Sequence, residues 1–214
     1  MPTGTSFSQY SLAAFAEALA AKTSTPGGGS LAAYMIACGA ATVAMAYRFT
    51  SGEKYAAEEA RMARRVEELD QLRSRALELV QLDSDAYDKV TAAFGLPKGN
   101  DAEKAARVTA IQSALKGALE VPFETMATGL AVLQLAIQGA SAINPNLASD
   151  CGSGANAALA GIESALANVR INAASIKDAN YVRGKSEASD AMLRKARELA
   201  DNVRGALQKH IGGK

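Results

Sequence analysis

The chain has 214 residues, a mass of 22.1 kDa and a formal net charge of +1 at pH 7. Apolar residues make up 49% and charged residues 21%, which excludes an intrinsically disordered chain, and the balanced charge predicts neither nucleic acid nor a membrane as a partner. The one histidine, His210, and the cysteines Cys38 and Cys151, which form no CxxC pair, disfavour histidine-based catalysis, a metal site and a disulfide framework. Unpaired cysteines favour a reducing, cytoplasmic location.

Alanine dominates the composition, with 47 residues, and there is no tryptophan. Because Ala is the best helix former and a poor strand former, an all-α fold is expected. Apolar residues at i, i+3, i+4 and i+7 predict a first helix over about residues 8–21. The segment Thr23–Ser30, which reads TSTPGGGS, is the strongest break in the sequence. It precedes an uncharged helix that is expected to end near residues 50–52.

The uncharged run Leu31–Tyr47 is the one segment for which a membrane span must be considered. A helix that crosses a bilayer needs about 20 predominantly apolar residues, and this run is shorter, rich in Ala and Gly and without an aromatic belt. A buried central helix of a bundle, without membrane contact, is therefore expected.

The rest of the chain reads as further long helices separated by short breaks. Asp101 is the expected N-cap of the fourth helix, and Pro122 is expected to kink or restart it. We therefore expect an all-α bundle of long antiparallel helices that forms a single domain over residues 1–214. Its many small residues suit a tight homodimer. The later helices are predicted at residues 54–94, 101–120, 122–140, 149–177 and 185–208.

The glycine segment is the first place where a polar or irregular motif interrupts the helical pattern. Three glycines before a helix let a ligand approach the backbone, and free N–H groups at a helix start favour an anion. A plain connecting loop explains the segment equally well. No lysine follows the glycines, so this is not a GxxxxGK[ST] phosphate loop. The residues concerned are Pro26, Gly27, Gly28, Gly29 and Ser30.

Two charged residues also stand out. Heptad steps from Leu69 through Ala76 reach Asp83, which places a carboxylate on an apolar seam, unless the helix is rotated and Asp83 is solvated. Lys54 precedes the same long helix and follows the uncharged one. In a partly apolar cleft its amine could serve as acid or base, although a single surface lysine is usually only solvated.

The fifth predicted helix carries Asn168 and Asn172 at i and i+4. Asn is unfavourable within a helix, so the pair suggests either ligand recognition or hydrogen bonds between helices. Asp150 at the start of this helix could be a cap, whereas Asp178 at its end opposes the helix dipole. Arg170 lies on a charged face that is typical of solvated surface.

Together these motifs resemble the formiminotransferase-cyclodeaminase family, which includes free-standing methenyltetrahydrofolate cyclohydrolases of one-carbon metabolism. The resemblance extends from about Leu12 to Asp178, and the first and last of its motifs are the most specific. It implies an all-helical, dimeric enzyme that binds a tetrahydrofolate derivative as substrate and has no tightly bound cofactor or metal. The matching segments are TPGGGS at 25–30, KY at 54–55, DxxAY at 83–87, LPK at 96–98, VP at 121–122, SDxG at 149–152 and NVRINxxSIKD at 168–178.

The family has two reactions. A cyclohydrolase hydrolyses 5,10-methenyltetrahydrofolate to 10-formyltetrahydrofolate, and a cyclodeaminase closes formiminotetrahydrofolate to the methenyl compound with release of ammonia. Because the chain has no formiminotransferase domain attached, the hydrolytic reaction is expected, with the cyclodeaminase as the alternative. A non-catalytic helical scaffold is a further alternative.

The resemblance also implies roles for individual residues. Lys54 is the candidate for proton transfer at the one-carbon unit, and Asp83 and Asp150 would orient water or the amine. The enzyme interpretation predicts that these three converge with Gly27–Gly29 on one cleft, from one subunit or two, whereas a scaffold predicts that they lie far apart. The expected substrate-binding residues are Pro26, Gly27, Gly28, Gly29, Ser30, Asn168, Arg170, Asn172 and Asp178.

Overall fold

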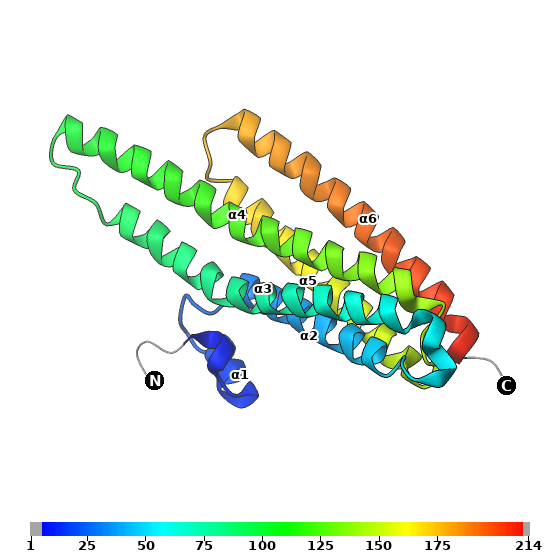
Figure 1. Cartoon of the computed structure of the whole chain (residues 1–214). Coiled ribbons are helices and arrows are strands. Elements are labelled where there is room, and N and C mark those ends of the chain that lie inside the picture. The colour runs from blue at the N-terminus through cyan, green and yellow to red at the C-terminus, as the bar shows by residue number, and fades with distance from the viewer. Residues whose placement is uncertain (1–5, 212–214) are drawn as a thin grey trace.

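The structure is a computed structural model that describes residues 6–211, and within that range it is helical without strands (Figure 1). The expected all-α bundle of long antiparallel helices is confirmed. Three short 3-10 helices, η1 (Phe7–Gln9), η2 (Glu53–Tyr55) and η3 (Pro145–Leu147), supplement the α-helices. The α-helices are α1 (Leu12–Ala20), α2 (Gly28–Arg48), α3 (Ala56–Phe94), α4 (Asp101–Ala140), α5 (Ala148–Ala173) and α6 (Ala179–Ile211).

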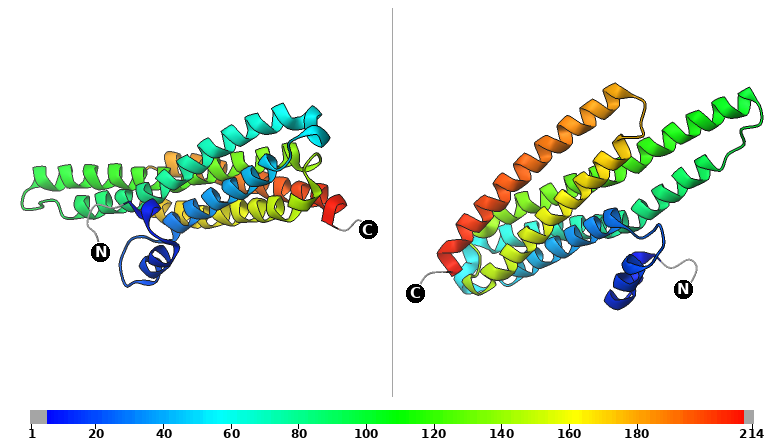
Figure 2. Two further views of the ribbon diagram at one scale, coloured as in Figure 1. Left: turned by 60° about the horizontal axis from the view of Figure 1, so that its bottom comes forward. Right: turned by 180° about the vertical axis from the view of Figure 1, so that it is seen from behind.

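Helix α2 runs along the bundle between α3 and α5, and α6 packs on the opposite side against α4 and α5. The hairpin of α3 and α4 extends beyond the start of α2 (Figures 1 and 2). The short helix α1 lies beside the bundle rather than within it (Figure 2). It is attached through buried Phe15, whose ring centroid is 5.3 Å from that of Tyr34 on α2.

Small residues allow the central helices to approach closely. A Cβ atom added at Gly39 of α2 would lie 2.7 Å from the carbonyl oxygen of Gly154 on α5. Real Cβ atoms do not come so near a backbone oxygen, so both positions must lack a side chain. Ala40, Ala44 and Ala158 are fully buried around this contact region. Ala and Gly therefore occupy the positions where α2 and α5 lie closest together.

Helix α4 differs from the prediction because it continues through Pro122. Proline has no N–H, so the carbonyl oxygen of Ala118, four residues earlier, loses its helical partner. The side-chain amide of Asn172 on α5 donates a hydrogen bond to that oxygen over 2.8 Å. A donor from another helix thus replaces the missing bond, and the predicted restart at Pro122 is wrong.

The helix ends also differ from the prediction in their caps. Ser11 caps α1, which starts later than predicted. Asn100, not Asp101, caps α4 by accepting a hydrogen bond from the backbone N–H of Glu103 over 2.9 Å. Asp178 accepts from the backbone N–H of Tyr181, so α6 starts earlier than predicted. Each correction is a side-chain hydrogen bond that satisfies a free N–H in a first turn.

By length and composition alone, α2 could cross a membrane. Much of it is instead buried in the bundle, where Ile36, Val43 and Tyr47 contribute to the core. The Tyr47 hydroxyl donates to the carbonyl oxygens of Leu135 and Ala136 on α4, each over 2.7 Å. The core of a helical bundle therefore accounts for the apolar character of α2 on its inner faces.

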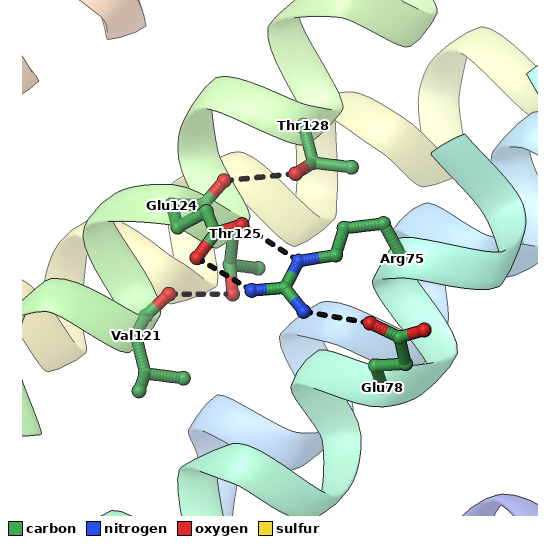
Figure 3. Close-up of polar contacts among 6 residues, drawn as sticks. All are labelled: Arg75, Glu78, Val121, Glu124, Thr125 and Thr128. Atoms are coloured by element: carbon green, nitrogen blue, oxygen red, sulfur yellow. Dashed lines mark hydrogen bonds and ion pairs between the residues drawn. The ribbon is translucent and has the colours of Figure 1, made fainter. Parts of the chain in front are cut away.

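Ion pairs join α3 to α4 at the surface (Figure 3). The Arg75 guanidinium donates from Nε and Nη2 to the two carboxylate oxygens of Glu124, over 2.7 and 3.0 Å, and from Nη1 to Glu78 over 2.6 Å. Both Arg75 and Glu124 are well exposed, with 40% and 45% of their side chains accessible. This forked contact aligns the two helices at the level of Pro122 but adds little stability in water.

Candidate active site

The glycine segment and Asp83 meet at the start of α2. The Ser30 hydroxyl, which is buried, donates a hydrogen bond to Asp83 Oδ2 over 3.0 Å, and the Ser30 backbone N–H also interacts with this carboxylate. Gly27, the N-cap residue, has no side chain to cap the helix. The Asp83 carboxylate from α3 therefore replaces the missing cap at the positive end of the α2 dipole.

Gly29 is what allows this contact. A Cβ atom at position 29 would lie 2.1 Å from Asp83 Oδ1. Any larger residue would force the carboxylate away from the first turn of α2. The glycine segment therefore provides a close backbone approach, and its immediate neighbour is a carboxylate of the same chain.

The partly buried position of Asp83 sets its electrostatics. Removal from water raises the pKa of Asp83 above its usual range, and the hydrogen bonds from Ser30 partly offset this increase. The alternative in which α3 is rotated and Asp83 is solvated is excluded by these contacts. A carboxyl group with a raised pKa at the start of a helix is suited to accept and return a proton.

Asn168 on α5 borders the same segment. A Cβ atom at Gly28 would lie 3.5 Å from Asn168 Nδ2, so the side chain and the exposed Gly28 backbone are neighbours. Asn168 Nδ2 donates to the carbonyl oxygen of Ser164 over 2.9 Å. Its Oδ1 receives no hydrogen bond from residues 6–211 and is available to a ligand. The first turn of α2, Asp83 and Asn168 thus form a polar group contributed by three helices.

Lys54 and Asp150 lie elsewhere in the chain. Lys54 is exposed in η2, just after the far end of α2, and its Nζ lies 5.4 Å from the centroid of the Tyr55 ring. The 21 residues of α2 separate it from Gly28 by about 30 Å at 1.5 Å per residue. Asp150, in the first turn of α5, lies about 27 Å along that helix from Asn168. Within one chain, neither residue converges with Asp83 as expected.

The remaining predicted binding residues already have partners within the chain. Arg170 forms an exposed ion pair with Asp190 over 3.0 Å. Lys116 pairs with Asp178 over 2.8 Å and, together with the backbone N–H of Tyr181, lowers the pKa of that carboxyl. The amide of Asn172 supports α4 at Pro122. Pro26 is buried at the entry to α2.

Comparison with known proteins places this geometry in a family. The family model described as formiminotransferase-cyclodeaminase matches residues 11–191. The chain belongs to the formiminotransferase-cyclodeaminase family. The match includes the glycine segment, Asp83 and Asn168.

Several relatives in this family have named activities. The chain is 37% identical over 190 residues to a methenyltetrahydrofolate cyclohydrolase of Methylorubrum extorquens. The match covers 88% of this chain and 91% of that protein. It is 30% identical over 200 residues to the rat formimidoyltransferase-cyclodeaminase, of which the match covers only 37%. A formiminotetrahydrofolate cyclodeaminase from Thermotoga maritima has the same fold, with a TM-score of 0.85, 26% identity and coverage of 95% of this chain and 98% of that one.

The sequence analysis did not identify one polar residue of the candidate site, Ser84. Ser84 is buried, and its hydroxyl lies 3.3 Å from that of Ser30. A step of four from Val80 reaches Ser84, whereas the heptad step from Ala76 reaches Asp83. Taken together, the two spacings indicate that Ser84 faces the core and that Asp83 lies at the edge of the core.

One well-formed cavity lies away from this site. A cavity of about 550 Å³ lies between α5 and α6 near Asp150, bordered by Ser149, Gly152 and Arg204. It is at the other end of α5 from Asn168. Among residues 6–211, no group of three His, Cys, Asp or Glu side chains is placed to hold a metal ion. The polar group at the start of α2 is the candidate active site because it joins side chains from three helices within the residues that the family model matches.

Proposed function

We propose that this protein is a methenyltetrahydrofolate cyclohydrolase that converts 5,10-methenyltetrahydrofolate to 10-formyltetrahydrofolate. The observation that carries this proposal is the 37% identity to a cyclohydrolase whose length the match almost completely covers. Identity to the relatives named formimidoyltransferase-cyclodeaminase is about 30%, over a minor part of their length. The proposal includes a cytoplasmic homodimer, a folate substrate and no tightly bound cofactor.

The reaction requires proton transfers at one carbon atom. A water oxygen bonds to the methenyl carbon between N5 and N10, and the water gives up one proton, which yields a neutral tetrahedral intermediate. The bond from carbon to N5 then breaks with its electron pair on N5, which takes up a proton. The remaining hydroxyl loses its proton as the formyl C=O forms on N10. One proton is released per turnover, so the site needs a base and an acid.

We assign the base to Asp83. Ionised, its carboxylate can take the proton of the attacking water, and its raised pKa makes that transfer more favourable. Ser30 holds the carboxylate at the start of α2 through the bond of 3.0 Å. Asn168 Oδ1 can accept hydrogen bonds from the amino and ring N–H groups of a pterin. These three residues are the binding and proton-transfer core of the proposal.

The cyclodeaminase reaction is the second candidate. Its support is the structural match to the Thermotoga maritima formiminotetrahydrofolate cyclodeaminase. That match covers 98% of the Thermotoga chain. A chain of this size can therefore carry that activity. Both reactions pass through a tetrahedral carbon that bridges N5 and N10, so the same base could serve either.

The two candidates are separated by offering both substrates to one preparation. The cyclohydrolase accelerates the loss of methenyltetrahydrofolate absorbance above the spontaneous rate and releases no ammonia from formiminotetrahydrofolate. Asp83→Asn should lower this rate at least tenfold, whereas Asp88→Asn, an exposed position on the same helix, should not. Ammonia release alone would assign the cyclodeaminase, and turnover of neither substrate would leave a scaffold.

A further inference from the structure

A small aromatic cavity lies next to the candidate active site, where η1 and α1 meet α2 and α3. Its volume is about 70 Å³, and four of the eleven aromatic residues of the chain line it. Among the lining residues in the range 6–211, none is charged. Such a concentration of rings around so small a space favours an apolar or aromatic occupant. The lining residues are Phe7, Ser8, Tyr10, Leu12, Phe15, Tyr34 and Val80.

The rings of the aromatic cavity belong to an apolar cluster of their own, apart from the main core of the bundle. The ring centroids of Phe15 and Tyr34 lie 5.3 Å apart, with the two planes inclined by 60°. Those of Phe7 and Tyr10 are also 5.3 Å apart, in an edge-to-face arrangement. Phe15 is buried, whereas Phe7, Tyr10 and Tyr34 are only partly buried, so part of their surface is accessible to a ligand.

Hydrogen bonds hold one wall of the aromatic cavity at a fixed place on α3. The backbone N–H of Phe7 donates to Gln81 Oε1 over 3.1 Å, and Gln81 Nε2 in turn donates to Asp85 Oδ1 over 2.8 Å. Gln81 lies in the chain between Val80, which lines the cavity, and Asp83. The η1 segment is therefore attached to the same turn of α3 that carries the proposed base.

The aromatic cavity begins one helical turn from the contact between Ser30 and Asp83. Tyr34 follows Ser30 by four positions on α2, and Val80 precedes Asp83 by three positions on α3. Residues at these spacings share one face of a helix and lie about 5–6 Å apart. Both helices therefore lead from the hydrogen-bonded pair toward the cavity. Asn168, in contrast, borders the start of α2 from the side of α5.

The substrate of the proposed reaction is divided in a matching way. Its methenyl carbon bonds to N5 of the pterin and to N10, and N10 carries the p-aminobenzoyl ring. With that carbon at Asp83, a pterin that reaches Asn168 leaves the ring on N10 on the side of the aromatic cavity. An engineered apolar cavity of about 150 Å³ binds benzene. A cavity of about 70 Å³ therefore admits the edge of one ring but not the two fused, polar rings of a pterin.

We propose that the aromatic cavity binds the p-aminobenzoyl ring on N10, and that Tyr34 and Phe15 thereby select folates over pterins that lack this ring. The inference rests on the proposed function and assigns the second end of its substrate. A contact between two aromatic rings strengthens binding by a factor of about 2–10. Because no bond to the ring forms or breaks in the reaction, the cavity acts on substrate binding rather than on the chemical step.

Calorimetric titration with two ligands tests this assignment without relying on turnover. Tetrahydrofolate carries the ring on N10, and 6-methyltetrahydropterin lacks it. Tyr34→Leu should weaken tetrahydrofolate binding by about tenfold and leave the binding of the pterin unchanged. Tyr34→Phe, which keeps the aromatic ring, should bind both ligands as the wild type does. Phe94→Leu, which removes an exposed ring at the end of α3, is the matched control and should change neither.

Steady-state kinetics with methenyltetrahydrofolate give a second measurement, in which Tyr34→Leu should raise KM by about tenfold with little change in kcat. An equal loss of affinity for both ligands would overturn the inference, because Tyr34 would then only support the fold of the site. Unchanged tetrahydrofolate binding by a folded Tyr34→Leu variant would overturn it as well. A wild-type protein that binds tetrahydrofolate through Tyr34 but turns over no substrate would instead refute the proposed reaction and leave the ring assignment in place.

Discussion

Ser30 and Asp83 are 53 positions apart in the chain, yet the hydroxyl of one donates to the carboxylate of the other over 3.0 Å. This bond joins the first turn of α2 to the side of α3. It combines two roles, because the carboxylate replaces a missing helix cap and also stands beside exposed backbone at Gly28. Stability and activity are therefore expected to respond together when this contact is changed.

Gly29→Ala is expected to break that contact. The new methyl group would overlap Asp83 Oδ1, so the variant should lose about 1–3 kcal/mol of unfolding free energy as well as most of its turnover. Gly117→Ala on α4 is the control, since its methyl group meets no atom within 4 Å. That change should raise the unfolding free energy by about 0.5–1 kcal/mol. Urea denaturation of both variants measures the difference, and equal effects would contradict the assignment.

Asp83→Asn is expected to alter the pH dependence of stability. A carboxyl whose pKa is higher in the folded chain than in the unfolded one adds more to the stability of the fold when it is protonated than when it is ionised. That contribution is complete below about pH 3.9, the unfolded value, and is lost as the pH rises through the raised folded pKa. The Asn variant lacks this loss, so its stability relative to wild type should increase from pH 4 to pH 7. A relative stability that falls over this range in urea titrations would contradict the prediction.

Asn172→Ala is expected to expose the backbone defect at Pro122. Without the amide, the carbonyl oxygen of Ala118 loses its donor, at a cost of about 1–3 kcal/mol. In a Pro122→Ala background the restored N–H can bond to that oxygen, so the same substitution should cost much less. A double-mutant cycle measured by thermal unfolding gives the coupling directly. Additive effects of the two substitutions would show that the amide does not serve this carbonyl.

Glu124→Gln is expected to have a small effect, because the ion pair with Arg75 is well exposed (Figure 3). The loss should be below about 1 kcal/mol, and it should shrink further in high salt, since screening weakens exposed pairs. Unfolding at low and high NaCl checks both statements. A loss of several kcal/mol that salt does not change would mean that the contact is far less hydrated than its exposure indicates.

The helical elements and the order in which they occur were predictable because helix propensity and apolar spacing are local properties. The alanine content, the uncharged run in α2 and the TSTPGGGS break each follow from a few neighbouring residues. Asp83 was recognisable as a carboxylate that continues an apolar seam. The family resemblance at the motifs of residues 25–30 and 168–178 also lay entirely within the sequence, and the match to residues 11–191 confirms it.

Only the tertiary structure could determine which residues meet. The continuation of α4 through Pro122 depends on an amide from α5, and the cap of α2 comes from α3, so no local pattern could reveal either. Lys54 lies near the C-terminal end of α2, and Asp83 lies near its N-terminal end. The number of residues between Lys54 and Asp83 in the sequence does not reveal this separation, because it depends on how the helices pack. Sequence determines elements through local energetics, whereas contacts between distant side chains depend on how the helices pack.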